Sequence, residues 1–115
     1  MSDTIIWHNP RCSKSRQTLA LLQEHGIEPS IRRYLEDSPS ADEIRAALAA
    51  LKTTPINAMR TKEAQFSALG LSSDTEADTL INAMAQHPIL IERPIVFHGN
   101  SAAIGRPPQA VLALF

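Results

Sequence analysis

The sequence predicts an α/β protein built as a β-α-β unit, a group of helices and a β-β-α unit. A β-branched and aromatic run at Thr4 to Trp7 precedes a helical pattern, and a second strand pattern follows at Pro29 to Leu35. Later in the chain, strand patterns at 94–98 and 102–104 are separated only by a tight, glycine-containing turn, which indicates an antiparallel hairpin. Together these segments predict a four-stranded mixed sheet.

The first unit has clear element boundaries. The first strand ends at Asn9-Pro10, a turn-forming pair, and the helical pattern runs from Ser13 to His25. Gly26 follows where a helix C-cap belongs. The connection between the two parallel strands is expected to be right-handed.

The middle of the chain predicts a helical insertion at approximately 39–88. Ser40, three residues before Glu43, is typical of a capped helix start. The helices expected here are 41–51, two short pieces at 56–59 and 63–69, and a longer one at 74–86. A last amphipathic helix is expected from Pro107 to Phe115, and residues 1–115 are expected to form a single domain.

Composition and charge exclude several classes of function. Eleven basic and twelve acidic side chains leave a formal charge of −1, which argues against nucleic acid as a partner. No apolar run approaches the roughly 18 residues of a membrane span, and no secretory leader is evident. We therefore expect no membrane partner and a cytoplasmic location, where a thiol stays reduced.

Cys12 is a candidate reactive thiol. It lies at the junction of the first strand and the following helix, where a helix N-terminus stabilises a thiolate. Arg16 and three other basic residues, His8, Arg11 and Lys14, lie within four positions of it. The alternative is a small apolar side chain in the core, which is the environment of most free cysteines. Because the chain has one cysteine, any redox cycle through it requires an external thiol.

Arginines at element boundaries are candidates for oxyanion binding. Arg60 separates two helical pieces, and Arg93 and Arg106 flank the predicted hairpin. Each could be an ordinary solvated surface charge. If the hairpin pairs with the first strand, however, Arg93 and Arg106 come to the end of the sheet near the thiol, where guanidinium groups suit a tetrahedral oxyanion.

Other site types are not supported by the spacing of residues. The four histidines lack metal-ligand spacing, so no metal is expected, and no glycine loop suited to a nucleotide is present. A Cys-x5-Arg anion loop is excluded because Thr18 occupies the sixth position after Cys12.

Several segments together resemble the glutaredoxin-coupled arsenate reductases of the ArsC type. They are His8-x3-Cys12-x3-Arg16 with Asn9-Pro10, Tyr34-Leu35-Glu36, Arg60, His87-Pro-Ile-Leu-Ile-Glu-Arg-Pro94 and Gly105-Arg106-Pro107. The segment Cys12-Ser-Lys-Ser-Arg16 is similar to a less characterised branch of that family.

The resemblance implies a thioredoxin-like fold with a helical insertion and a cis peptide bond before Pro94. It implies that Cys12 is the nucleophile, that Arg60, Arg93 and Arg106 bind the oxyanion, and that His8 favours the thiolate. Arsenate would be the substrate, glutathione the co-substrate and glutaredoxin the partner, with no bound cofactor.

Two alternatives of other classes stay open. One is a thiol-responsive regulator resembling the Spx-type proteins that bind RNA polymerase, although Ser15 stands where those carry a second cysteine. The other is a glutathione-dependent thiol transferase.

Overall fold

The computed structural model describes residues 3–115, which divide into two compact units. One unit comprises the chain up to Asp37 together with Arg93–Phe115, and the other comprises Ser38–Glu92. The second unit contains the helical insertion expected at approximately 39–88.

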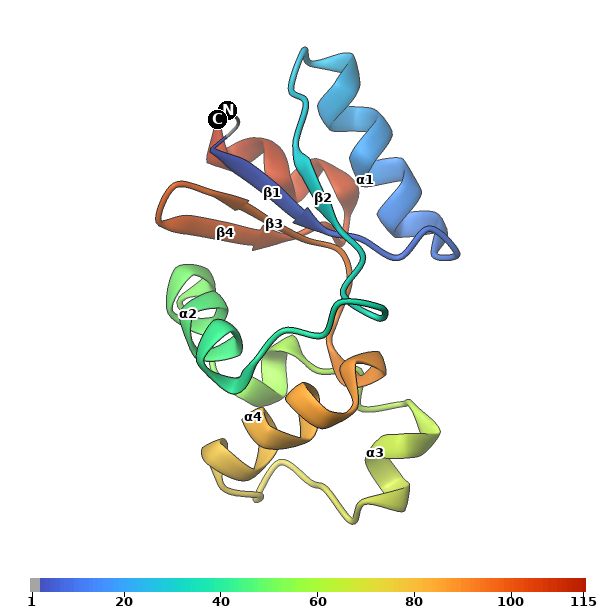
Figure 1. Ribbon diagram of the computed structural model, residues 1–115, viewed down its shortest axis with the longest axis vertical. Helices are drawn as coiled ribbons and strands as arrows, with labels where there is room; N and C mark the ends of the chain where they lie inside the picture. The colour runs from blue at the N-terminus through green and yellow to red at the C-terminus, as the bar shows by residue number, and fades with distance from the viewer. Residues whose placement is uncertain (1–2) are drawn as a thin grey trace. The chain divides into compact units, whose positions relative to one another are not determined.

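The first unit is built on a four-stranded mixed sheet in the order β2-β1-β3-β4 (Figure 1). Its strands are β1 (Thr4–Trp7), β2 (Ser30–Arg32), β3 (Ile95–His98) and β4 (Ser101–Ile104). β1 pairs in parallel with β2, whereas the β1–β3 and β3–β4 pairs are antiparallel. The predicted mixed sheet and hairpin are therefore confirmed, and the hairpin lies directly beside β1.

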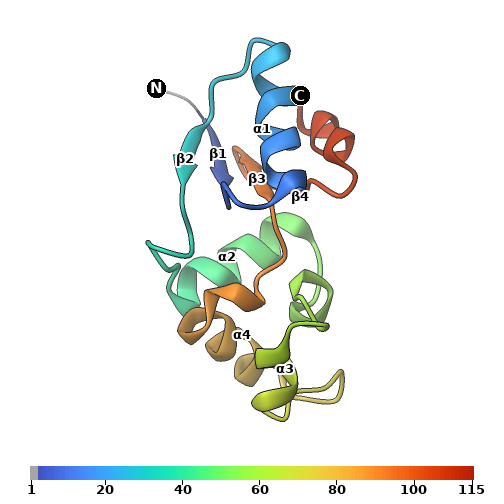
Figure 2. The same ribbon diagram turned by 90° about the vertical axis from the view of Figure 1, so that its right-hand side faces the viewer.

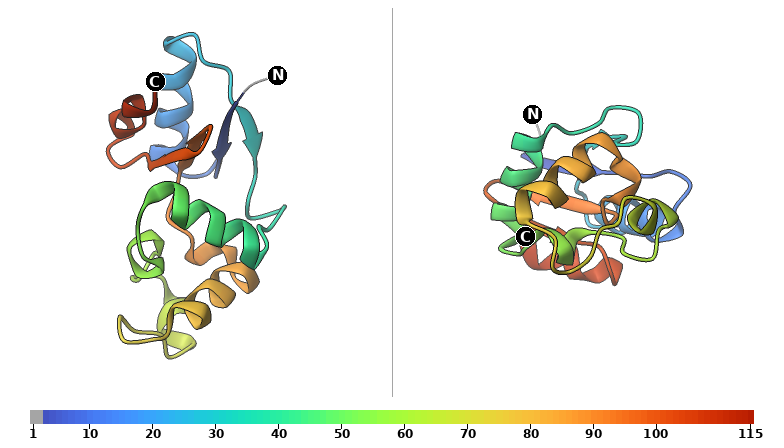
Figure 3. Two further views of the ribbon diagram at one scale, coloured as in Figure 1. Left: turned by 90° about the vertical axis from the view of Figure 1, so that its left-hand side faces the viewer. Right: turned by 90° about the horizontal axis from the view of Figure 1, so that it is seen from below.

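Two helices cover one face of this sheet (Figures 2 and 3). They are α1 (Ser13–Glu24) and a 3₁₀ helix, η3 (Pro108–Leu114). Four fully buried side chains form the core between helices and sheet, with Ile6 and Val96 on the strands, Leu22 on α1 and Val111 on η3. This core joins α1 and η3 to β1 and β3.

The second unit is helical. It contains α2 (Ala41–Leu51), α3 (Ala64–Ala68), α4 (Ala77–Gln86) and two short 3₁₀ helices, η1 (Pro55–Ala58) and η2 (Pro88–Leu90). The Ser40 hydroxyl accepts from the Glu43 N–H, and the Glu43 carboxylate accepts from the Ser40 N–H, so the predicted capping box is present. Among residues 3–115, no helix is both long and apolar enough to cross a bilayer.

Three predicted elements differ from the structure. β2 ends at Arg32 and not at Leu35, because the N–H groups of Glu36 and Asp37 both bond back to the Arg33 carbonyl and form a turn. α4 begins at Ala77 and not at Asp74, because a turn closed by the Ser72 and Thr75 side chains precedes it. The C-terminal helix is 3₁₀ throughout, as the bond from Ala110 N–H to the Pro107 carbonyl illustrates.

Gly105 allows α1 to pack closely against the end of the hairpin. Its N–H donates to the Pro94 carbonyl at 2.9 Å. A Cβ atom on this residue would stand 2.5 Å from Thr18 Oγ1 and 2.8 Å from Pro94 Cγ. Only glycine fits this close approach without a shift of the helix or of the residues around Pro94.

We predict that Gly105→Ala lowers the free energy of unfolding by about 1–3 kcal/mol, the usual cost of overpacking. Urea denaturation measures the change. In a double-mutant cycle, Thr18→Ala should offset part of the loss because it removes the nearest obstructing atom. Strict additivity of the two changes would show that Gly105 and Thr18 do not compete for space.

Candidate active site

Cys12 is the N-cap residue of α1, and the residue is only 8% exposed. The preceding turn is held by Asn9, whose carbonyl accepts from the Cys12 N–H and whose side-chain oxygen accepts from the Arg11 N–H, both at 3.0 Å. This arrangement aims the backbone N–H groups of Ser15 and Lys14 at the sulfur, and both donate hydrogen bonds to it. The helix N-terminus predicted from sequence is therefore in contact with the thiol.

Opposing effects act on the pKa of Cys12, and the net result is a value below that of an ordinary thiol. Burial raises the pKa, because it penalises the charged thiolate. The N–H bonds from Ser15 and Lys14 lower it, and so does the guanidinium of Arg93 through its charge and a hydrogen bond. Hydrogen bonds and charge together outweigh the effect of burial, which favours the nucleophilic form.

Two of the predicted arginines lie beside the sulfur. Arg106 Nη2 approaches Cys12 Sγ at 3.8 Å, and Arg106 Nε donates to the Arg93 carbonyl at 2.9 Å. Arg93 precedes β3 and Arg106 follows β4, so the hairpin brings both to the end of the sheet at which β1 finishes. The expected convergence of Arg93 and Arg106 at Cys12 is confirmed.

Each of these arginines precedes a cis proline. The Arg93–Pro94 bond is cis, as predicted, and so is the Arg106–Pro107 bond, which the sequence analysis did not anticipate. The Arg-Pro pair at 106–107 is identical to the one at 93–94, and that repetition was the available signal.

His8 contacts Ser15 and not the sulfur. Its Nδ1 lies 2.6 Å from the buried Ser15 hydroxyl, which also accepts from the Asn9 N–H at 3.0 Å. Burial lowers the pKa of His8, and the charges of Arg33 and Arg16 lower it further. A neutral imidazole is thereby favoured, so any influence of His8 on the thiolate would pass through Ser15. The thiolate-tuning role of His8 stays a prediction.

Sequence reasoning missed Ser15 as a site residue. It considered this position only as the place of an absent second cysteine. The fully buried hydroxyl joins His8 to the turn before Cys12, while the Ser15 backbone donates to the sulfur. Its spacing, one helical turn after Cys12, was the signal.

Arg16 and Arg60 have different surroundings. Arg16 Nη1 donates to the Pro10 carbonyl at 2.9 Å and braces the turn, and its predicted effect on the thiolate stays a prediction. Arg60 belongs to the helical unit, where its Nη1 lies 3.0 Å from a Glu63 carboxylate oxygen. Its oxyanion-binding role also stays a prediction. Within residues 3–115, no group of three or more His, Cys, Asp or Glu side chains is arranged for a metal ion.

Comparison with known proteins shows the family to which the chain belongs. A model of the ArsC family matches residues 7–114. The chain belongs to the ArsC family. It is 45% identical to a Haemophilus influenzae protein named arsenate reductase, over 96% of this chain and 97% of that one. It is 46% identical to the uncharacterised protein YfgD of Escherichia coli, over 95% and 93% of the two chains.

A solved structure of a similar protein confirms the fold. The arsenate reductase from Vibrio cholerae superposes with a TM-score of 0.94 at 46% identity, covering 97% of both chains. Its agreement with the mixed sheet described above confirms the thioredoxin-like α/β class expected from the sequence.

We predict that Cys12 is alkylated by iodoacetamide with a pH midpoint below that of the same chain unfolded in urea. Since the folded pKa is the lower one, the thiolate stabilises the fold fully above the unfolded pKa, and this stability is lost as pH falls through the folded pKa. Arg93→Gln should raise the midpoint, and Arg45→Gln, which alters a surface pair with Asp42, should not. Equal midpoints for native and unfolded chains would contradict the assignment.

Proposed function

We propose that this ArsC-family protein reduces arsenate to arsenite, with Cys12 as nucleophile and glutathione and glutaredoxin as reductants. The observation that carries the proposal is the buried thiol, which receives N–H bonds from the first turn of α1 and has Arg106 Nη2 at 3.8 Å. The names of the relatives from Haemophilus influenzae and Vibrio cholerae support arsenate as the substrate.

The first step is an exchange of ligands on arsenic. The Cys12 thiolate attacks the arsenic atom, an As–S bond forms, and a hydroxide leaves as water after it takes up a proton. Arg93 and Arg106 hold the oxyanion, because fork-shaped guanidinium groups bind tetrahedral oxyanions through paired hydrogen bonds. In this proposal Arg60 provides a third guanidinium.

The second step is the reduction. A glutathione thiolate attacks the Cys12 sulfur of the adduct, so that an S–S bond forms while the As–S bond breaks. The two sulfur atoms give up two electrons and arsenic receives them, passing from the pentavalent to the trivalent state. Arsenite leaves, and Cys12 stays in a mixed disulfide with glutathione.

The third step restores the thiol. A thiolate of glutaredoxin attacks the glutathione sulfur of the mixed disulfide, and Cys12 is released as the thiolate. The thiols of glutathione and glutaredoxin supply all the electrons of this cycle, so the proposal includes no bound cofactor. A reducing compartment is needed throughout, and we therefore place the protein in the cytoplasm.

We predict that Arg93→Lys, Arg106→Lys and Arg60→Lys each lower kcat/KM for arsenate by about 10–100-fold, because lysine keeps the charge but loses the paired hydrogen bonds. Steady-state assays with saturating glutathione and glutaredoxin measure the effect. Arg45→Lys, in an exposed pair with Asp42, is the matched control and should stay within twofold. Similar values for all four variants would place the anion site elsewhere.

We also predict that turnover requires glutathione together with glutaredoxin, is slight with thioredoxin alone and is abolished by Cys12→Ser. Among residues 3–115 there is no second cysteine to form an internal disulfide, which is the usual substrate of thioredoxin. Mass spectrometry of protein held without glutaredoxin should detect glutathione on Cys12. Multiple turnovers with thioredoxin as the sole thiol source would exclude this resolving step.

Two further assays, set beside arsenate turnover, separate the alternatives. A thiol transferase would release glutathione from glutathionylated proteins at a high rate and turn over arsenate only incidentally. A polymerase-binding regulator would be retained by RNA polymerase in a pull-down and would lack steady-state arsenate turnover.

A further inference from the structure

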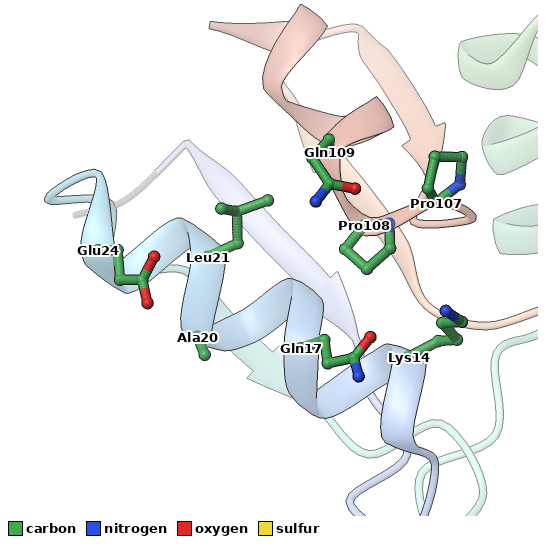
Figure 4. Close-up of a pocket in the computed structure, with 8 residues that line it drawn as sticks. All are labelled: Lys14, Gln17, Ala20, Leu21, Glu24, Pro107, Pro108 and Gln109. Atoms are coloured by element: carbon green, nitrogen blue, oxygen red, sulfur yellow. The ribbon is translucent and has the colours of Figure 1, made fainter.

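A groove lies between α1 and the segment that follows Arg106 (Figure 4). It has a volume of about 410 Å³, within the range of small-molecule sites. On the α1 side it is lined by Lys14, Gln17, Ala20, Leu21 and Glu24, and on the other side by Pro107, Pro108 and Gln109. None of these side chains has a role in the proposed chemistry at the sulfur.

One end of the groove is lined by residues that belong to, or directly follow, the segments in contact with the thiol. Lys14, whose backbone N–H bonds to Cys12 Sγ, lies in the first turn of α1 and forms part of the lining. Pro107, on the facing segment, directly follows Arg106, whose Nη2 is 3.8 Å from the same sulfur. From this adjacency we infer that a molecule whose sulfur reacts with Cys12 beside Arg106 places the rest of its length in the groove.

The lining matches a short anionic peptide in length and chemistry. From Lys14 to Glu24 the helix rises about 15 Å, and an extended tripeptide spans about 10 Å. Lys14 is exposed and offers a cation near the thiol, while the exposed amides of Gln17 and Gln109 can pair with peptide groups or a carboxylate. Leu21 and Pro108 provide an apolar base between them.

We propose that this groove binds the tripeptide of glutathione, with the glycine carboxylate on Lys14 and the γ-glutamyl arm along Gln17 and Gln109. Glutathione has two carboxylates and one ammonium at neutral pH, so a lysine near its thiol and neutral amides further along suit it. The proposal rests on the proposed function, since it specifies where the thiol co-substrate sits. Glu24 lies beyond the reach of the γ-glutamyl arm and takes no part.

The test uses thiol–disulfide exchange without arsenate, so that its result does not depend on whether the protein reduces arsenate. Oxidised glutathione reacts with the Cys12 thiolate, one S–S bond breaks, the Cys12–glutathione disulfide forms and one glutathione thiolate leaves. Dithiodipropionate is the reference disulfide, because it has two carboxylates but no peptide arms. Quenched reaction mixtures are analysed by mass spectrometry. The rate constant for oxidised glutathione divided by that for dithiodipropionate reports recognition of the tripeptide.

We predict that Gln17→Glu, Gln109→Glu and Lys14→Gln each lower this ratio by about fivefold, the effect expected from one exposed polar contact. Lys62→Gln, which removes one exposed lysine of the helical unit, and Glu24→Gln should leave the ratio within twofold. Iodoacetamide alkylation of the Gln17 and Gln109 variants should match the unsubstituted protein, which shows that Cys12 itself is unaltered.

Two outcomes would overturn the groove assignment. If the glutamate variants react more slowly with both disulfides to the same extent, the new charges repel anions in general and the groove does not bind the tripeptide. An unchanged ratio in all three groove variants would place glutathione elsewhere. If the ratio falls as predicted but arsenate is not turned over, the assignment of the groove to glutathione is supported and the assignment of arsenate as substrate is wrong.

Discussion

The short turn from β1 to α1 is the constraint on which the site depends. Asn9 closes it by accepting from the Cys12 and Arg11 N–H groups, and the Ser15 hydroxyl accepts from the Asn9 N–H in return. The turn is fastened to the sheet where the His8 N–H donates to the Arg32 carbonyl at 2.8 Å. These bonds fix the sulfur at the first turn of α1, so the backbone dipoles are already oriented when a thiolate forms and no reorganisation is required.

The sheet supplies the second half of the site. Because β3 and β4 form a hairpin beside β1, residues that enter and leave the hairpin meet at the edge where β1 ends. Arg93 and Arg106 are those residues, and the fold brings Arg106 to Cys12 although it lies 94 positions later in the chain. Gly105 keeps this edge close to α1, since its missing side chain is what allows Thr18 and Pro94 to approach. Gly105 and Pro94, which pack this end of the sheet, are therefore direct chain neighbours of the two arginines at the thiol.

Most of this architecture could be predicted from local patterns, and the departures have local causes. The strand at Thr4–Trp7, the helix after Cys12 and the hairpin are strongly patterned, and each is present. The end of β2 and the start of α4 were wrong because short-range hydrogen bonds to Arg33 and Ser72 compete with regular structure there. The Ser15–His8 bond could not be predicted, because it depends on how the turn folds back onto α1.

The positions of the arginines also solve an electrostatic problem in the proposed reaction. A thiolate and an arsenate oxyanion must come into contact, and two like unit charges 4 Å apart repel by about 1 kcal/mol in water and about 4 kcal/mol near a protein surface. Burial lowers the pKa of His8 and so disfavours a positive charge there that would oppose this repulsion. Arg93 lowers the pKa of the thiol and Arg106 lies 3.8 Å from the sulfur, so guanidinium charge is already present where the second anion would arrive. The groups that stabilise the nucleophile are thus the ones that would allow its substrate to approach.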